Sequence, residues 1–178
     1  MKFVRVMNGN ISHASGYRFQ IDEINISPVW NPHADNAKDF GGFNFTNEEN
    51  VLRWMIRGDT LYDVFVPDGA EIVAIDNQNT PNGVWRTNKI IVSNPRKITE
   101  SMCIEFYNIS HFPEKTYFHV LAIMAGKGFG NMCDMIINDK VNEDNVGLCI
   151  SEYLEFSFYK EAGVYNDVLE TLYAIMGS

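Results

Sequence analysis

Residues 41–73 read GGFNFTNEENVLRWMIRGDTLYDVFVPDGAEIV and contain two alternating segments that predict strands, one on each side of a helical pattern. We expect these strands at GGFNF, from Gly41, and at LYDVFV, from Leu61, because alternating apolar and polar side chains bury one face of a sheet. Pro67-Asp68-Gly69 predicts a turn, since proline presets φ and glycine accepts a positive φ. LYDVFV is therefore expected to form an antiparallel hairpin with AEIVAI, which begins at Ala70.

The segment between the two strands has the pattern of an amphipathic helix. Thr46-Asn47-Glu48-Glu49 matches a capping box, in which the threonine hydroxyl accepts a hydrogen bond from a backbone N–H and a glutamate reaches back to the cap. Gly58 is expected to end the helix. Apolar residues at helical spacing should form its buried stripe: Val51, Leu52, Met55 and Ile56.

Outward from this stretch, the rest of residues 1–98 is also rich in strand signals. Alternation predicts strands at FVRV near the start, at YRFQIDEINI from Tyr17 and at NKIIVS from Asn88. The segment DNQNTPNGVWR, from Asp76, contains a proline and an Asn-Gly pair, so we expect a long loop there.

From Thr99 onward the apolar periodicity becomes helical. Five helices are expected, near residues 99–109, 113–126, 130–138, 143–157 and 164–176. The apolar stripe of the last helix should dock within the chain or, alternatively, form a homodimer with a second copy. Strands followed by helices predict an α+β protein, with a β-rich subdomain at 1–98 and an acidic helical subdomain at 99–178 in one compact unit.

Charge changes along the chain at the same boundary. Residues 1–98 carry ten Lys and Arg against eleven Asp and Glu, whereas residues 99–178 carry four Lys against twelve Asp and Glu. Because uncompensated charge on a small domain steers its partners, the helical subdomain is expected to bind a basic protein. Four of the twelve carboxylates are expected in first helical turns, where the helix dipole favours negative charge: Glu100, Glu114, Glu143 and Asp144.

Two sets of residues are candidates for contacts with a partner. Carboxylates in the last two predicted helices would hold a basic protein by steric and electrostatic occlusion: Glu143, Asp144, Glu152, Glu155, Asp167 and Glu170. Alternatively, the chain is a DNA-binding accessory protein. The side chains that would neutralise phosphates or stack on bases are Arg53, Arg57, Trp85, Arg86 and Lys89. The formal net charge of −9 weighs against this alternative, because nucleic-acid affinity rests on a basic field.

The sequence gives little signal for catalysis, metals or a membrane. Four histidines are scattered without H-x-x-x-H or H-x-H pairs, so we expect no metal site and no cofactor. Three cysteines stand among apolar residues and are predicted to be buried free thiols: Cys103, Cys133 and Cys149. The start, MKFVRVMNGN, lacks the apolar core of a secretory signal, and no apolar run is long enough to cross a bilayer. A cytoplasmic protein is therefore expected.

Residues 41–73, and TPNGVWRTNKIIVSNPR at 80–96, resemble segments of small uncharacterised proteins carried by bacteria, phages and plasmids. In size, acidity and lack of a catalytic signature the chain is similar to phage anti-CRISPR proteins, the counter-defence inhibitors of Cas nucleases. That resemblance implies a non-enzymatic interaction protein that occupies the basic nucleic-acid channel of a nuclease, with carboxylates in place of phosphates.

An alternative resemblance implies an enzyme. Gly42-Phe43-Asn44-Phe45 is similar to the GFHF-like segment that leads into a helix in ADP-ribosyltransferase-like domains. The chain has Asn44 where a histidine is expected, and Glu152-x-x-Glu155 in place of the E-x-E pair of arginine-modifying members. The resemblance implies use of NAD, with Arg86 or His13 on its pyrophosphate or ribose and Glu152 as the acidic catalyst.

Overall fold

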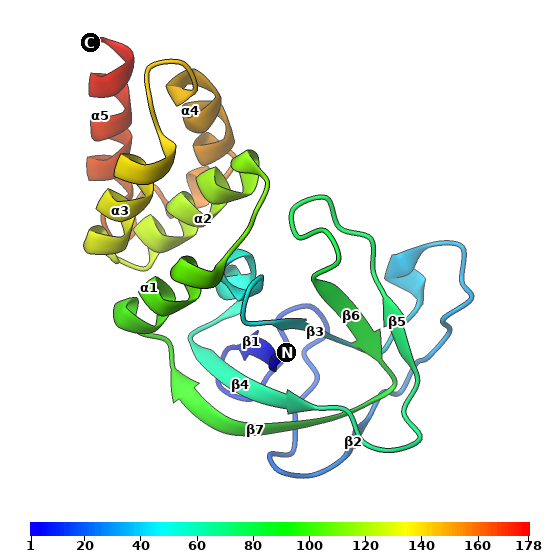
Figure 1. Cartoon of the computed structure of the whole chain (residues 1–178). Helices are drawn as coiled ribbons and strands as arrows, with labels where there is room; N and C mark the ends of the chain where they lie inside the picture. The colour runs from blue at the N-terminus through cyan, green and yellow to red at the C-terminus, as the bar shows by residue number, and fades with distance from the viewer. The chain divides into compact units, whose positions relative to one another are not determined.

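The computed structural model describes residues 1–178 and has the α+β architecture expected from the sequence (Figure 1). The chain divides into two compact units, Met1–Ile98 and Thr99–Ser178. All seven strands lie in the first unit and all five α-helices lie in the second. No helix combines the length and the apolar character that a membrane crossing requires.

The first unit is built on one antiparallel sheet with the strand order β2-β7-β4-β1-β3-β6-β5. Its strands are β1 (Phe3–Met7), β2 (Asn25–Ile26), β3 (Phe43–Asn47), β4 (Thr60–Phe65), β5 (Ile72–Ala74), β6 (Val84–Thr87) and β7 (Lys89–Lys97). Two 3₁₀ helices lie in the connections, η1 (Ala37–Asp39) and η2 (Val51–Arg57). The N-terminal strand β1 is central, because β3 and β4 pair with its two edges.

Aromatic and aliphatic side chains form the core of this unit. The buried members of the cluster are Met7, Phe19, Phe43, Phe45, Tyr62, Val64, Ile90 and Val92. The Trp85 ring packs against this cluster, with its centroid 5.3 Å from that of Phe3 and 5.9 Å from that of Phe45. Trp85 belongs to strand β6, where it pairs with Phe45 of β3, so the prediction of a loop through this residue is wrong.

The turn predicted at Pro67–Gly69 is present, but the hairpin predicted from it is wrong. The Ala70 N–H donates to the Pro67 carbonyl at 3.1 Å, and Gly69 has a φ of +72°. Strand β4 nevertheless pairs with β1 and β7, so both of its edges are occupied. After the turn the chain continues to the edge of the sheet, where β5 pairs only with β6.

The long strand predicted from Tyr17 is reduced to the two residues of β2. At the start of β2, the buried Asn25 side chain accepts a hydrogen bond from the Gln20 N–H at 2.8 Å and donates to the Gln20 and Glu23 carbonyls at 2.9 and 3.0 Å. Asp22 has a φ of +61°. A turn closed by a side chain replaces the strand, because the amide satisfies backbone groups that a neighbouring strand would otherwise satisfy.

The predicted capping box is also wrong. Thr46 lies in β3, and its hydroxyl donates to the Gly83 carbonyl at 2.6 Å, so it ties β3 to the start of β6 and caps no helix. The helical segment is the 3₁₀ helix η2, which begins at Val51 and ends at the predicted Gly58. The predicted buried stripe is correct for Val51, Leu52 and Met55, whereas Ile56 is half-buried.

The second unit contains the five helices expected from the sequence. They are α1 (Glu100–Ile109), α2 (Glu114–Gly126), α3 (Gly130–Lys140), α4 (Val146–Leu154) and α5 (Tyr165–Met176), with the 3₁₀ helix η3 (Ser157–Tyr159) before α5. Residues 116–125 of α2 are all buried, and α3, α4 and α5 pack against this helix. Glu143 and Asp144 precede α4, so their predicted place in its first turn is wrong.

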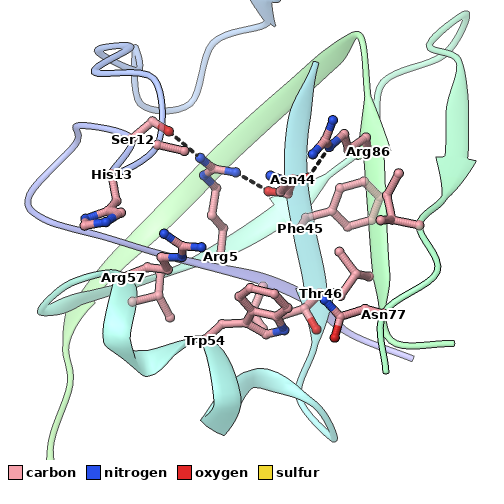
Figure 2. Close-up of a pocket in the computed structure, with 15 residues that line it drawn as sticks. Arg5, Ser12, His13, Asn44, Phe45, Thr46, Trp54, Arg57, Asn77 and Arg86 are labelled. Carbon is pink, nitrogen blue, oxygen red and sulfur yellow. Dashed lines mark hydrogen bonds between the residues drawn. The ribbon is translucent and has the colours of Figure 1, made fainter. Parts of the chain in front are cut away.

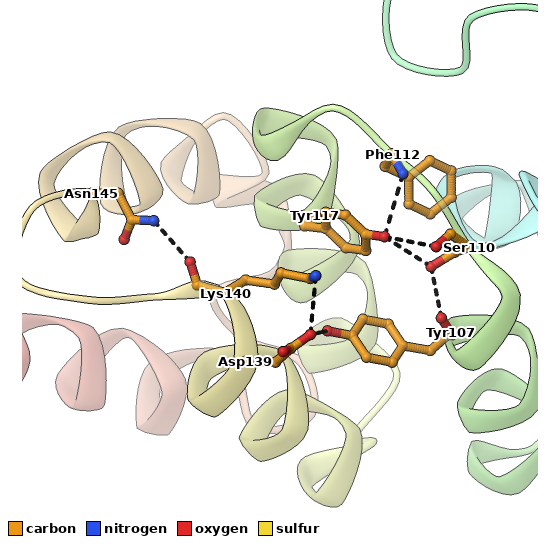
Figure 3. A network of polar contacts seen from close by, with 7 residues as sticks. All are labelled: Tyr107, Ser110, Phe112, Tyr117, Asp139, Lys140 and Asn145. Carbon is orange, nitrogen blue, oxygen red and sulfur yellow. Dashed lines mark hydrogen bonds and ion pairs between the residues drawn. The ribbon is translucent and has the colours of Figure 1, made fainter.

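A polar network joins the end of α1, the start of α2 and the end of α3 (Figure 3). The Tyr117 hydroxyl donates to the Ser110 carbonyl at 3.0 Å, and the Tyr107 hydroxyl donates to Asp139 at 2.6 Å. The Lys140 ammonium lies 3.1 Å from the same carboxylate and 4.5 Å from the centroid of the Tyr117 ring. Asp139 and Lys140 therefore contribute to helix packing within the unit.

We expect Gly42→Ala to destabilise the first unit by about 2 kcal/mol or more. Gly42 has a φ of +76°, and a Cβ there would lie 2.6 Å from the Trp30 ring, so a steric clash adds to backbone strain of about 1–2 kcal/mol. Urea unfolding measures the loss. Gly69→Ala is the matched control, because its φ is +72° and nothing surrounds its Cβ position. Equal losses in the two variants would contradict the importance of the Trp30 contact.

Candidate functional site

A pocket of about 190 Å³ lies over β1, β3 and β6 of the first unit (Figure 2). The loop at residues 12–14, the helix η2 and the segment that follows β5 complete its walls. Its fifteen lining residues include no aspartate and no glutamate, but they include four side chains that carry or can accept positive charge: Arg5, His13, Arg57 and Arg86. In a chain with 23 acidic and 14 basic residues, this local composition is a strong departure from the average.

Arg5 projects from the central strand and has only neutral hydrogen-bond acceptors. Its guanidinium group donates to the Ser12 hydroxyl at 2.9 Å and to the backbone carbonyl of Asn44, and it lies 5.0 Å from the centroid of the Phe19 ring. Its buried Nε makes no hydrogen bond. Burial, and then the charge of Arg57, lower the pKa of Arg5 to about 10. No carboxylate of the chain pairs with this cation.

Arg86 is also held by neutral groups. It stands opposite Asn44 in the β3–β6 register, and its Nε donates to Asn44 Oδ1 at 2.6 Å. A second guanidinium nitrogen donates to the carbonyl of Ala37 in η1, and the ring of Phe40 lies 5.9 Å away. Burial lowers the pKa of Arg86. Asn44 therefore accepts hydrogen bonds from two arginines, through its backbone oxygen from Arg5 and through its side chain from Arg86.

Arg57 and Trp54 bring η2 into the pocket. The Arg57 guanidinium lies 5.9 Å from the Trp54 ring centroid and forms no ion pair with a carboxylate. Figure 2 shows it beside Arg5 and on the same side of the pocket as His13, whose side chain is exposed. The indole Nε1 of Trp54 is buried and makes no hydrogen bond. The guanidinium groups of Arg5 and Arg57, which form no ion pair, and the Nε1–H of Trp54, which donates to no group, therefore line one pocket.

The pocket brings together part of what the sequence suggested. Arg57 and Arg86 from the nucleic-acid set line it, as does His13 from the enzyme alternative. The other members of the nucleic-acid set do not line it, and Trp85 packs against the core. Arg5 is not among the residues predicted from the sequence, although a lone arginine inside the otherwise apolar FVRVM is a signal that could have identified it.

The carboxylates predicted to contact a partner lie in the second unit. Five of them are exposed and form no ion pair: Glu143, Asp144, Glu155, Asp167 and Glu170. The sixth, Glu152, is half-buried, 2.7 Å from Nε2 of His119 and 3.2 Å from the Lys115 ammonium. The hydrogen bond with His119, together with Lys115, lowers the pKa of Glu152. The charge of Glu152 is therefore balanced within its own unit.

The three cysteines are buried and free, as predicted. Burial raises the pKa of each thiol to about 12, so the thiols are protonated and weakly nucleophilic at neutral pH. No group of three or more His, Cys, Asp or Glu side chains is arranged to hold a metal ion.

No family model matches the chain, and no curated protein or solved structure matches it either. The pocket itself has the chemistry of an anion-binding site, because arginine N–H donors converge where the chain supplies no negative charge.

We expect Asn44→Asp to stabilise the first unit by about 1 kcal/mol, since the new carboxylate turns the hydrogen bond with Arg86 into a charge-assisted one and balances a desolvated cation. Urea unfolding at neutral pH measures the change. Asn82→Asp, the same substitution at an exposed loop position, is the control and should change stability by no more than a few tenths of a kcal/mol. A loss of stability in Asn44→Asp would contradict the absence of a counter-charge in the pocket.

Proposed function

We propose that the first unit is a binding module for a small ligand that carries a phosphate group. The observation that carries this proposal is the set of three arginines that line one pocket without an acidic partner. A guanidinium group offers N–H donors in a planar fork that matches the oxygens of a phosphate. A phosphate monoester carries about −1.5 to −2 charges at neutral pH, which two arginines balance.

The energetics of Arg5 support an anionic ligand. Taking a cation out of water is unfavourable unless a charge or hydrogen bonds compensate it, and the lowered pKa of Arg5 reflects this penalty. An anion between Arg5 and Arg57 would remove their mutual repulsion and form charge-assisted hydrogen bonds with both. The arrangement is unfavourable for the stability of the empty pocket and favourable for binding, as is common at functional sites.

The size of the pocket limits the ligand. Its volume of about 190 Å³ lies below the roughly 300–1,000 Å³ that is typical of pockets for drug-sized molecules. A phosphate and the group attached to it fill such a space, whereas a dinucleotide such as NAD would be enclosed only in part. His13 and Arg86, either of which the ADP-ribosyltransferase-like alternative places on NAD, line this pocket, whereas Glu152, its acidic catalyst, does not. A calorimetric titration with NAD tests that alternative directly.

Inorganic phosphate at low ionic strength should bind the unmodified chain and raise its melting temperature above that in chloride of equal ionic strength. Arg57→Gln should weaken this binding at least tenfold, because it removes a charge-assisted hydrogen bond worth about 1.5–3 kcal/mol. Isothermal titration calorimetry measures both affinities. Arg18→Gln removes the same charge from an exposed position outside the pocket and should bind phosphate as the unmodified chain does. Equal weakening in both variants, or no phosphate binding at all, would overturn the proposal.

A second candidate function concerns the helical unit. We propose that its exposed carboxylates bind a basic protein, such as a nuclease of a defence system, and block it without turnover. This proposal is supported by the five carboxylates of the predicted contact set that are exposed and form no ion pair within the chain. Glu155 and Glu170 are suitable test positions, because both are exposed and neither carboxylate forms an ion pair.

Binding of the intact protein to a panel of Cas nucleases, measured by biolayer interferometry, should weaken as salt rises from 50 to 500 mM. The double variant Glu155→Lys with Glu170→Lys should weaken it further at low salt. Glu105→Lys, at an exposed position on α1, is the matched charge-reversal control. No binding to any nuclease at 50 mM salt, or binding that the double variant leaves unchanged, would refute this second proposal.

A further inference from the structure

The side of the pocket away from Arg5 and Arg57 is polar but uncharged. Figure 2 shows Thr46 and Asn77 there, with the indole nitrogen of Trp54 directed toward them. Asn77 Oδ1 accepts hydrogen bonds from the Asn79 N–H at 3.0 Å and from the N–H and hydroxyl of Thr80 at 3.2 and 3.3 Å. None of these hydrogen bonds uses the amide nitrogen of Asn77, so its two N–H groups remain available.

Thr46 adds an acceptor to these donors. Its hydroxyl hydrogen is used in the bond to the Gly83 carbonyl, which leaves the lone pairs of the oxygen. Together with the buried Nε1 of Trp54, which donates to no group, this side of the pocket offers both donors and acceptors without a charge. Hydroxyl groups donate and accept at once, so they fit such a lining better than a second anion does.

Much of the remaining lining of the pocket is apolar. The side chains that form this part are Val4, Val6, Phe45, Ile75 and Val84. A ligand that fills the space therefore has C–H surface in addition to an anionic group and hydroxyl groups.

We infer that the ligand is a sugar monophosphate, with its phosphate between Arg5 and Arg57 and its hydroxyls at Trp54 and Asn77. This inference rests on the proposed phosphate site. It adds the chemical class of the group that is attached to the phosphate. The sugar is either free or the sugar-phosphate part of a nucleotide, because both present the same groups to the pocket. A dicarboxylate or a pyrophosphate would place a negative oxygen against the lone pairs of Thr46, and a pyrophosphate also has no C–H surface for the apolar part of the lining.

Calorimetry of the unmodified chain with ribose 5-phosphate and with inorganic phosphate tests the inference without any substitution. Ribose 5-phosphate should bind roughly tenfold more tightly, since each added hydrogen bond contributes about 0.5–1.5 kcal/mol. Adenosine monophosphate separates the two sources: tighter binding than ribose 5-phosphate supports a nucleotide, and equal or weaker binding supports a free sugar phosphate.

Trp54→Phe removes the indole N–H and retains an aromatic ring beside Arg57. It should reduce the affinity for ribose 5-phosphate about fivefold and leave the affinity for inorganic phosphate unchanged. Trp30→Phe is the matched control, because the Trp30 indole donates to Glu71 at 3.2 Å and lies outside the pocket lining. Should Trp54→Phe fail to fold, the comparison of ligands on the unmodified chain still decides the question.

The outcomes separate this inference from the proposed function. If neither inorganic phosphate nor ribose 5-phosphate binds, the proposed phosphate site is wrong and the inference fails with it. If both bind with equal affinity, the phosphate site stands and the sugar preference is wrong. If ribose 5-phosphate binds more tightly and Trp54→Phe weakens both ligands equally, Trp54 supports the fold of the pocket and does not contact the sugar, which also refutes the inference.

Discussion

The guanidinium group of Arg5 is the point on which the first unit depends. It projects from the central strand β1. Its two hydrogen-bond acceptors are the hydroxyl of Ser12, in the loop after β1, and the backbone carbonyl of Asn44 in β3. Asn44 of β3 then positions Arg86 of β6, which in turn binds the carbonyl of Ala37. Arg5 and Arg86 therefore link β1, β3 and β6 through the neutral acceptors of Asn44. Hydrogen bonds hold the group in place, but they leave its charge uncompensated, and this separates its structural role from its proposed binding role.

Local patterns predict this fold where the interactions are local. The five helices and most strands follow from periodicity, because each buries a face that its own sequence defines. The errors occur where a distant group decides the outcome. Thr46 bonds to Gly83 and caps no helix, Asn25 closes a turn in place of a strand, and β4 has both edges taken by strands far away in sequence. The sequence predicts Arg57 and Arg86 as binding residues because they are basic. Nothing in the sequence marks Trp54 or Asn77, which join the pocket only through the fold.

Net charge and local charge give different information about this protein. The first unit is close to neutral as a whole, yet its pocket contains three arginines and no carboxylate. The second unit carries the acidic surplus, and that surplus is reduced where Glu152 meets His119 and Lys115 and where Asp139 meets Lys140. The net charge of a unit does not reveal the basic pocket. It also overstates the acidity of the surface, because it counts charges that are already paired.

The complete burial of residues 116–125 in α2 has a consequence for the dynamics of the second unit. A helix without a solvent-facing side cannot detach one turn at a time, since each turn is covered by neighbouring helices. The amide hydrogens of this buried segment are therefore expected to exchange with solvent only when the unit opens as a whole, and to be the slowest-exchanging ones of the unit. The exposed end of α5 exchanges through local fraying, so the two helices differ in timescale although both are regular α-helices.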